Sequence, residues 1–359
     1  MSTQVRTRAS REAKLSALQH TLSESVAALV TGEDWKRALT FAARFRSRSF
    51  NNTMLIYAQH YSAYQEGRVP QPTPTYVAGF HQWLSLGRHV MKGQHGYAIL
   101  APVTARIASP NPTDPGSWHR LARGERPGFG ETVKSKLIGL KPTHVWDVSQ
   151  TAGEPVPELP RPNLLRGEAP SGLWDGLADQ ITARGFDLRL VSSAAAIGGA
   201  NGLTDFLARE ISVRTDMDDA AQVKTLAHEL GHVLLHAPRE NTVSTDLAAD
   251  ATMHRGIAEV EAESIALMVG ATHGLDTSAY TIPYVSTWAA SVPGKTPVEV
   301  VQSTAERVRG AALGILDKLD MQKIGDGTPP GLYREALSHR VGTAPIATGA
   351  RTDGPVLGR

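Results

Sequence analysis

The sequence predicts a two-domain α+β protein, and three observations support this prediction. Residues 1–150 carry 19 Lys and Arg against 9 Asp and Glu, a net charge of +10, whereas residues 151–359 carry 18 against 26, a net charge of −8. A stretch with five prolines, residues 153–172, lies between these halves. Helix-like and strand-like patterns occur on both sides of it. We therefore expect a basic domain of residues 1–152, a linker of residues 153–172 and a second domain of residues 173–323.

The pattern of the first domain predicts helices followed by short strands. Apolar residues at helical spacing over residues 11–30 predict a helix, and residues 34–47 continue in the same style. Residues 70–102 mix aromatic and β-branched residues with glycines, which predicts short strands and turns around one short helix. Residues 144–150 predict another strand.

The second domain alternates helical and strand patterns. Strands are expected over residues 186–191 and 209–215, and an acidic cluster around Asp218 supplies charge at the start of a helix that runs to about Pro238. Further helices are expected over residues 173–185, 254–274 and 296–319. From residue 324 the chain is rich in Gly, Pro, Thr and Arg, and residues 324–359 are expected to form a disordered tail.

The composition excludes several classes of site. The 359 residues include no cysteine, which rules out disulfides, thiolate zinc sites, iron–sulfur clusters and cysteine nucleophiles. The N-terminal stretch has no signal-peptide pattern, and no apolar run approaches the ~20 residues of a membrane span. We therefore expect a cytoplasmic protein with no membrane contact.

A metal-binding pattern, H-E-x-x-H, lies in residues 224–236. His228 and His232 are four residues apart, so on a helix they lie about 6 Å apart on one face and can bind the same ion. Glu229 falls within the same arc of the helix as the two histidines. The alternative is a chance match on a core helix. That alternative is disfavoured because the opposite face carries Val223, Leu226, Leu230, Val233 and Leu234.

A third ligand must come from another helix. His236 lies two turns from His228, about 12 Å along the axis, so it is expected to contact the site from outside or to belong to the core. Glu259 and Glu263 are four residues apart, so they share a helix face from which Glu261 points away. We expect Glu259 to bind the metal and Glu263 to hold a ligand histidine by its other ring nitrogen. The alternative is a solvated helix face.

These motifs carry a resemblance to a known family. "TLAHELGHVLLH" followed by "AEVEAESIAL" resembles the gluzincin-type zinc domain of the ImmA/IrrE family and of ArdC-like antirestriction proteins, over residues 185–290. The resemblance implies a zincin-like metallopeptidase domain with one Zn²⁺ per chain, bound by His228, His232 and Glu259. It also implies that Glu229 is the general base and that the substrate is a protein or peptide.

The basic half has features of single-strand binding. Single strands are held by cations that follow the phosphates and by aromatic rings that stack on bases, whereas a duplex reader would need a recognition helix that we do not find. The alternative is that the rings are core and the arginines form a solvated face. The expected contact residues are Arg44, Arg46, Arg48, Phe50, Asn51, Asn52, Trp83, Arg88 and Lys92.

Residues 10–152 resemble the N-terminal domain of ArdC-like proteins through "FNNTMLIYAQ", "TYVAGFHQWLSLGRHVMKGQHGYAILAP" and "VWDVSQTAG". That resemblance implies binding of single-stranded DNA (ssDNA) in protection of incoming mobile-element DNA. The expected function is thus an ssDNA-binding zinc metallopeptidase of the antirestriction type, whose strand 209–215 pairs with an extended substrate. Two alternatives stay open: a DNA-coating factor whose metal is structural, and a protease that destroys a repressor.

Overall fold

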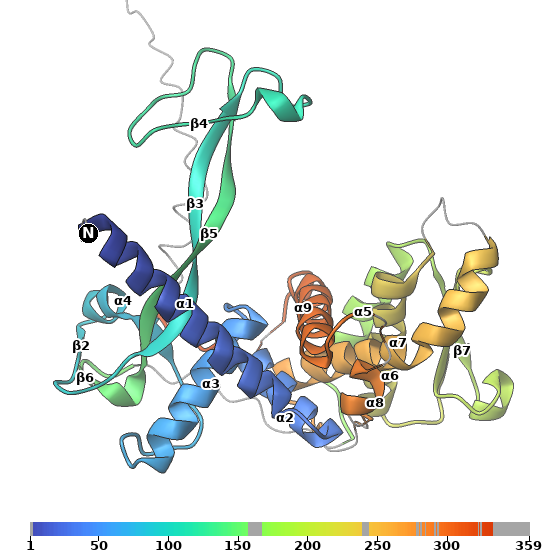
Figure 1. Cartoon of the computed structure of the whole chain (residues 1–359). Coiled ribbons are helices and arrows are strands. Elements are labelled where there is room, and N and C mark those ends of the chain that lie inside the picture. Colours follow the sequence, from blue (N-terminus) through green and yellow to red (C-terminus); the bar gives the residue numbers. More distant parts are fainter. Residues whose placement is uncertain are drawn as a thin grey trace, which may run out of the picture.

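The computed structural model of the protein mixes helices and sheets (Figure 1). It describes residues 3–156, 167–238, 244–277, 280, 282–283, 285–290, 292, 294–321, 323 and 325–332. The mixture of helix and sheet agrees with the predicted α+β class. None of the described helices combines the length and apolar character that a membrane span needs.

Three helices open the chain: α1 (Thr3–Ala27), α2 (Gly32–Arg44) and α3 (Phe50–Gln65). The start of α2 is fixed by a capping box, in which the Asp34 amide donates to Thr31 Oγ1 at 3.1 Å and the Thr31 amide donates to Asp34 Oδ2 at 2.9 Å. Such reciprocal bonds satisfy amides that the helix itself leaves without a partner. Ser49 caps α3 in a similar way by accepting from the Asn52 amide at 3.3 Å.

A four-stranded antiparallel sheet follows, in the order β1-β5-β3-β4. Its outer part is a long arm of β3 and β5 that extends away from the helices (Figure 1), and every residue from 132 to 141 on β5 is exposed. The sequence predicted only the inner end of this arm, through the short strands expected within residues 70–102 and the strand expected at residues 144–150. The strands and short helices of this region are β1 (Val77–Gly79), α4 (Phe80–Ser85), β2 (Arg88–Val90), β3 (Tyr97–Ser109), η1 (Pro115–Ser117), β4 (His119–Arg120), β5 (Thr132–Asp147), η2 (Val148–Gln150) and β6 (Thr151–Gly153).

The remaining described chain forms a three-stranded sheet with helices packed against it. The sheet has the order β7-β9-β8, with β7 parallel and β8 antiparallel to β9. Its strands agree with those expected at residues 186–191 and 209–215, and β8 was not expected. The elements are α5 (Leu173–Thr182), β7 (Asp187–Val191), η3 (Ala194–Ile197), β8 (Gly202–Asp205), β9 (Glu210–Arg214), α6 (Asp219–His236), α7 (Ser244–Thr272), α8 (Val285–Ala289) and α9 (Pro297–Leu316).

The position of β9 corrects the expectation that residues 209–215 pair with a substrate. β9 is the central strand, with β7 on one side and β8 on the other, so its backbone groups are already used within the sheet. Ile211 and Val213 are fully buried. An extended substrate can be added only to a strand with a free edge, and β8 lies at an edge of this sheet.

The hydrophobic core extends across the domain boundary that the sequence suggests. One continuous cluster joins α1, α2 and α3 to α5, α6, α7 and α9. At its centre, Trp35 of α2 is fully buried, donates from Nε1 to Ser264 Oγ of α7 at 2.9 Å, and packs edge-on against Trp288 with ring centroids 5.3 Å apart. The first three helices are therefore attached to the second half of the chain by direct packing as well as by the linker, whose residues 157–166 lie outside the described residues.

Residues 325–332 differ from the expected disordered tail, because they pack against the first half of the chain. The Val77 amide donates to the Gly327 carbonyl at 2.8 Å, and Leu332 is buried against Ala78 and Trp83. Gly327 has φ of +79°, and a Cβ there would lie 2.4 Å from Cδ1 of Phe45, so only glycine fits this contact. Residues 333–359 lie outside the described residues.

Candidate metal centre

Helix α6 presents the H-E-x-x-H motif because its two faces differ in polarity. Asp218 caps the helix by accepting from the Ala221 amide at 2.8 Å. Leu226 and Leu230 are fully buried in the core, which fixes the rotation of the helix and turns the histidines away from the core. A helix with this burial pattern holds His228 and His232 on one face before any metal is present.

Gly231, inside the motif, lets helix α7 approach α6 closely. A Cβ at this position would lie 3.2 Å from Cα of Ala262 and 3.3 Å from Cδ1 of Ile265. A larger residue would push the two helices apart and carry the glutamates of α7 away from the histidines. The glycine of the motif is thus explained by helix packing.

The structure brings His228, His232 and Glu259 together with the spacing of metal ligands. One nitrogen or oxygen atom from each lies within 4.8 Å of the others. The two Nε2 atoms are 3.1 Å apart, and the Glu259 carboxylate oxygens lie 3.4 Å from His228 Nε2 and 3.6 Å from His232 Nε2. Two atoms bound to one tetrahedral zinc at about 2.0–2.1 Å are about 3.3 Å apart. The three side chains therefore fit a divalent ion with one position left for water.

The carboxylates around the histidines favour positive charge at the site. Burial alone would lower the pKa of His228, but its hydrogen bonds with Glu259 and Glu263 outweigh this effect and raise the pKa to about 9. The same hydrogen bond to His228, followed by one to His232, lowers the pKa of Glu259. Without a metal the site thus holds a proton, and a divalent cation satisfies the same electrostatic demand.

Each ligand histidine is held by its other ring nitrogen, in two different ways. Glu263 Oε2 lies 3.3 Å from His228 Nδ1, and Lys224 Nζ lies 2.8 Å from Glu263 Oε1. This contact makes Nδ1 of His228 a donor and leaves Nε2 free for the metal. The structure thus places Glu263 where the sequence analysis expected it.

His232 is held through a second histidine. His232 Nδ1 lies 3.0 Å from His236 Nδ1, and His236 Nε2 lies 3.0 Å from Glu261 Oε2. Because His236 Nε2 donates its hydrogen bond to Glu261, His236 Nδ1 is free to accept a hydrogen bond from His232 Nδ1. His232 Nε2 is then left unprotonated and faces the metal position. Glu261 is fully buried and also pairs with Arg307 of α9. The sequence analysis placed His236 outside the ligand set but gave Glu261 no role.

The side chain of Glu229 points from α6 toward strand β8. It is buried, and its Oε2 accepts from Thr204 Oγ1 at 2.7 Å. A Cβ on Gly202 would lie 2.6 Å from Glu229 Oε1 and 2.6 Å from Thr225 Cγ2, so glycine lets β8 lie directly on this face of the helix. This buried carboxylate is therefore adjacent to a sheet edge that an extended peptide could join.

Two of the expected DNA contacts are corrected by their burial. Phe50 and Trp83 are fully buried; Phe50 packs against Trp35 with ring centroids 6.0 Å apart, and Trp83 Nε1 donates to the Trp146 carbonyl at 3.0 Å. A ring enclosed on both faces cannot stack on a base. The alternative considered for these aromatic residues, a core role, is the one that the structure supports.

Three further expected contacts have structural partners. Asn52 bonds the backbone of Leu100 with both its side-chain atoms, Nδ2 to the carbonyl and Oδ1 from the amide, each at 2.9 Å. Arg48 donates to the Val77 carbonyl at 2.6 Å, and burial lowers the pKa of its guanidinium. Arg88 donates to Thr151 Oγ1 and to the Thr151 carbonyl, both at 2.9 Å. These side chains hold the N-terminal fold together.

The other expected contacts remain more accessible. Arg44 and Lys92 are exposed, whereas Arg46 is half-buried and donates to the Ala43 carbonyl at 2.8 Å. Asn51 is half-buried, and its Oδ1 is enclosed without a hydrogen-bond partner among the described residues. Of the nine expected residues, only Arg44 and Lys92 are exposed.

Comparison with known proteins assigns the first part of the chain. Residues 18–125 match the family model of the N-terminal domain of anti-restriction factor ArdC. This match covers the chain from the end of α1 through β4, which includes strand β3 of the arm but not β5, and it agrees with the resemblance stated for this region. The match does not extend to His228, His232 and Glu259, so the assignment of a candidate metal centre depends only on the distances given above.

Two solved structures and one curated protein are similar over most of the chain. The metal-free antirestriction ArdC protein of plasmid R388 is 20% identical, covers 84% of this chain and 97% of its own, and has a TM-score of 0.48. The Mn(II)-bound form is 16% identical, covers 85% and 99%, and has a TM-score of 0.43. An uncharacterized protein of Bacillus anthracis is 25% identical over 327 residues, which are 86% of this chain. The chain spans about half the length of that curated relative, 50%.

Some residues of the centre carried no recognised signal in the sequence. Lys224 lies four residues before His228 and so on the same face of α6, which could have marked it as a partner for Glu263. Thr204 and Arg307 reach the site from β8 and α9, and their proximity depends on the tertiary fold. No local pattern in the sequence could have found these two.

Proposed function

We propose that the protein is a zinc metallopeptidase joined to an ssDNA-binding region, and that it protects incoming mobile-element DNA from restriction. The observation that carries the enzymatic part is the convergence of His228, His232 and Glu259 beside the buried Glu229. Two imidazoles and one carboxylate are a donor set of catalytic zinc sites, with an open position for water. The donor set supports zinc over magnesium or calcium, which prefer oxygen ligands alone.

The residues of this chain have separate tasks in peptide hydrolysis. When bound, zinc supplies a Lewis acid that makes water a good nucleophile near neutral pH. Glu229 accepts the proton of the attacking water and passes it to the leaving amine as the carbon–nitrogen bond breaks. The Thr204 hydroxyl, 2.7 Å from Glu229 Oε2, holds the carboxylate in place. An extended peptide lies along the free edge of β8, next to Glu229.

The proposed DNA binding rests on charge and on the comparison of the first half. Residues 1–150 carry a net charge of +10, from 19 basic and 9 acidic residues, which favours a polyanionic partner. The similarity of residues 18–125 to the ArdC N-terminal domain supports the antirestriction role. The binding surface must lie on exposed groups, and only Arg44 and Lys92 of the contacts that the sequence suggested are exposed.

A second candidate function is a DNA-protecting factor that cleaves nothing. It is favoured by the shared core, in which the second half of the chain packs directly against α1, α2 and α3 and thereby supports the region assigned to DNA. In that case the metal would stabilise the fold. The buried Glu229 argues for catalysis, because a structural metal site needs no carboxylate held beside the ligands.

Glu229→Gln separates the two candidates. Glutamine has the same shape and its oxygen can still accept from Thr204, so metal content, thermal stability and ssDNA binding should stay unchanged. Hydrolysis of an unfolded protein substrate and protection of incoming DNA in a restricting host should both be lost under the first candidate. Full protection by the variant would refute the catalytic proposal and support the DNA-protecting factor.

A further inference from the structure

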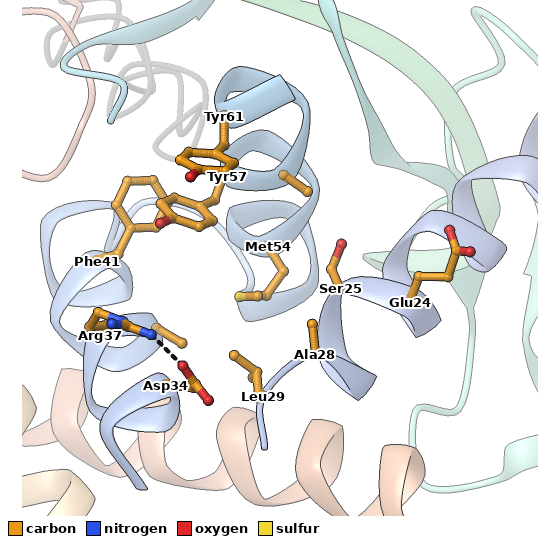
Figure 2. Close-up of a pocket in the computed structure, with 12 residues that line it drawn as sticks. Glu24, Ser25, Ala28, Leu29, Asp34, Arg37, Phe41, Met54, Tyr57 and Tyr61 are labelled. Carbon is orange, nitrogen blue, oxygen red and sulfur yellow. Dashed lines mark hydrogen bonds and ion pairs between the residues drawn. The ribbon is translucent and has the colours of Figure 1, made fainter. Parts of the chain in front are cut away.

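A pocket of about 360 Å³ lies between α1, α2 and α3, far along the chain from the metal centre. Its floor is apolar, with Ala28, Leu29, Ala38, Met54 and Ala58 among the lining residues. Figure 2 shows the rings of Phe41, Tyr57 and Tyr61 on one side of the pocket and Glu24 and Ser25 on another. This volume is at the lower end of the range of about 300–1,000 Å³ that is typical of small-molecule pockets.

The aromatic side of the pocket continues out onto the surface. Phe41 and Tyr57 have ring centroids 5.0 Å apart, and Tyr57 and Tyr61 are stacked with centroids 6.2 Å apart and an angle of 13° between their planes. Tyr61 is 42% exposed and Tyr64, one turn further along α3, is 40% exposed. The rings therefore lead from a covered pocket to an open aromatic surface.

Positive charge runs along the neighbouring helix. Arg37, Phe41 and Arg44 are spaced i, i+4 and i+7 on α2, so the two arginines lie on the same side of the helix as the ring that lines the pocket. Arg44 is exposed, and Arg37, with a side chain 72% exposed, pairs with Asp34. Cations beside exposed rings are the combination that binds single-stranded nucleic acid.

The charges inside the pocket indicate which part of a nucleotide would enter. Glu24 and Asp34 are both lining residues, and their carboxylates would repel a phosphate. Asp34 is already engaged by Thr31 and Arg37, whereas Glu24, with a side chain 69% exposed, can accept from a base amino group beside its pairing with His20. An apolar floor, an aromatic side and a carboxylate acceptor suit a nucleobase, whereas the charged sugar–phosphate backbone of the nucleic acid would be repelled.

We infer that this pocket holds an unpaired nucleobase of a bound single strand, and that Tyr61 stacks on the adjacent base. This inference rests on the proposed ssDNA binding and gives it a location. The phosphates between the bases would run along Arg37 and Arg44 of α2. The pocket would also select against duplex DNA, because a paired base is stacked within the helix and cannot enter.

The test uses the full chain and two strands of equal length and charge. One is a fluorescently labelled oligodeoxycytidine, and the other has the same number of phosphates but abasic sites in place of the bases. Fluorescence anisotropy at one salt concentration should show that the protein binds the oligodeoxycytidine at least tenfold more tightly than the abasic strand.

Three variants identify the pocket as the cause. Tyr61→Ala removes an exposed ring, and Ala58→Phe fills the pocket; each should weaken binding of oligodeoxycytidine about tenfold and leave binding of the abasic strand unchanged. Phe129→Ala is the matched control, since Phe129 is an exposed ring on the arm segment between β4 and β5, and it should change neither affinity.

The outcomes separate this inference from the function on which it rests. Equal affinity of the wild-type protein for both strands, or oligodeoxycytidine binding that Tyr61→Ala and Ala58→Phe leave unchanged, would overturn the base pocket while the proposed ssDNA binding stands. If the wild-type protein binds neither strand, the ssDNA-binding proposal itself fails, and the inference fails with it.

Discussion

Replacing Glu263 with glutamine should weaken metal binding although Glu263 is not a proposed ligand. The side chain keeps its size, but its negative charge is lost from a group that lies 3.3 Å from His228 Nδ1 and 2.8 Å from Lys224 Nζ. The charged acceptor makes the His228 imidazole a stronger donor to a metal. Glutamine can still accept from one of these partners but no longer carries the charge.

The expected size of the effect follows from this position. Loss of a group that holds a ligand histidine costs about 10- to 100-fold in metal affinity, or about 1.4–2.8 kcal/mol. Near neutral pH, the measured loss of Zn²⁺ affinity in Glu263→Gln should be smaller than this. The hydrogen bond with Glu263 helps to raise the pKa of His228 to about 9, so the variant also binds the competing proton less tightly. The full loss should appear above pH 9, where His228 is deprotonated in both proteins.

Competition with a chromophoric chelator for Zn²⁺, at pH 7 and above pH 9, measures both effects. Glu259→Gln, which changes a proposed ligand, should lose more affinity than Glu263→Gln at both pH values. Glu33→Gln, which changes an exposed carboxylate that pairs with Lys36, should lose none. Unchanged affinity of Glu263→Gln above pH 9 would refute the reasoning. Loss of zinc in Glu263→Gln with full retention in Glu259→Gln would show that the two roles are reversed.

Two further predictions concern pH and the shared core. The affinity of the wild-type protein for Zn²⁺ should rise about tenfold per pH unit up to about pH 9, because His228 must release its proton to bind the metal. The stability of the metal-free protein should change in the opposite direction. The protonated His228 contributes its full stabilisation below pH 6.5, and this contribution is lost as the pH rises through about 9. Chelator titrations and metal-free urea denaturation across this range check both trends, and a flat affinity would contradict them. Trp35→Ala should destabilise the protein by about 3–5 kcal/mol, and Trp35→Phe, which keeps a ring but leaves the buried Ser264 hydroxyl without its donor, by about 1–3 kcal/mol. A loss below about 1 kcal/mol for Trp35→Ala in urea denaturation would show that the two halves do not depend on this contact.

The candidate site could be predicted from the sequence to the extent that it depends on helix periodicity. The spacing of His228 and His232, and of Glu259 and Glu263, places each pair on one helix face whatever the rest of the fold does. The structure places these four residues as the spacing suggests. The prediction that Glu261 points away from the Glu259 face agrees with the structure, but its contact with His236 was not predicted. Periodicity gives the direction of a side chain and cannot show which residue of another helix it meets.

The sheet edge could not be predicted for a different reason. Alternation of apolar and polar residues identifies β9 as a strand, but the same alternation occurs in central and edge strands. Strand β8 is only four residues long and begins at Gly202, which weakens any strand signal. Its position beside Glu229 depends on the antiparallel pairing of β8 with β9, which is a tertiary contact.

The expected DNA contacts show the limit of reasoning from residue type. Arginines and aromatic rings occur both in nucleic-acid surfaces and in cores, and the sequence carries no local measure of burial. Phe50 and Trp83 are enclosed, whereas Tyr61, which has the same periodicity as its buried neighbours on α3, is 42% exposed. Only the packing of α3 against α1, α2 and the sheet decides which rings remain available.

The shared core also changes how the two halves of the chain can cooperate. A linker alone would let the proposed DNA-binding part and the proposed peptidase part move independently, and it would act only by raising the local concentration of substrate. Here Trp35 on one side of α2 bonds Ser264, the residue after Glu263, while Arg37 and Phe41 line the pocket on another side of the same helix. A strand bound at the pocket would therefore be held at a fixed position relative to the metal centre. A target protein on the same strand would then have to lie within reach of that position, so the geometry of the shared core, more than the length of the linker, would decide what can be cleaved.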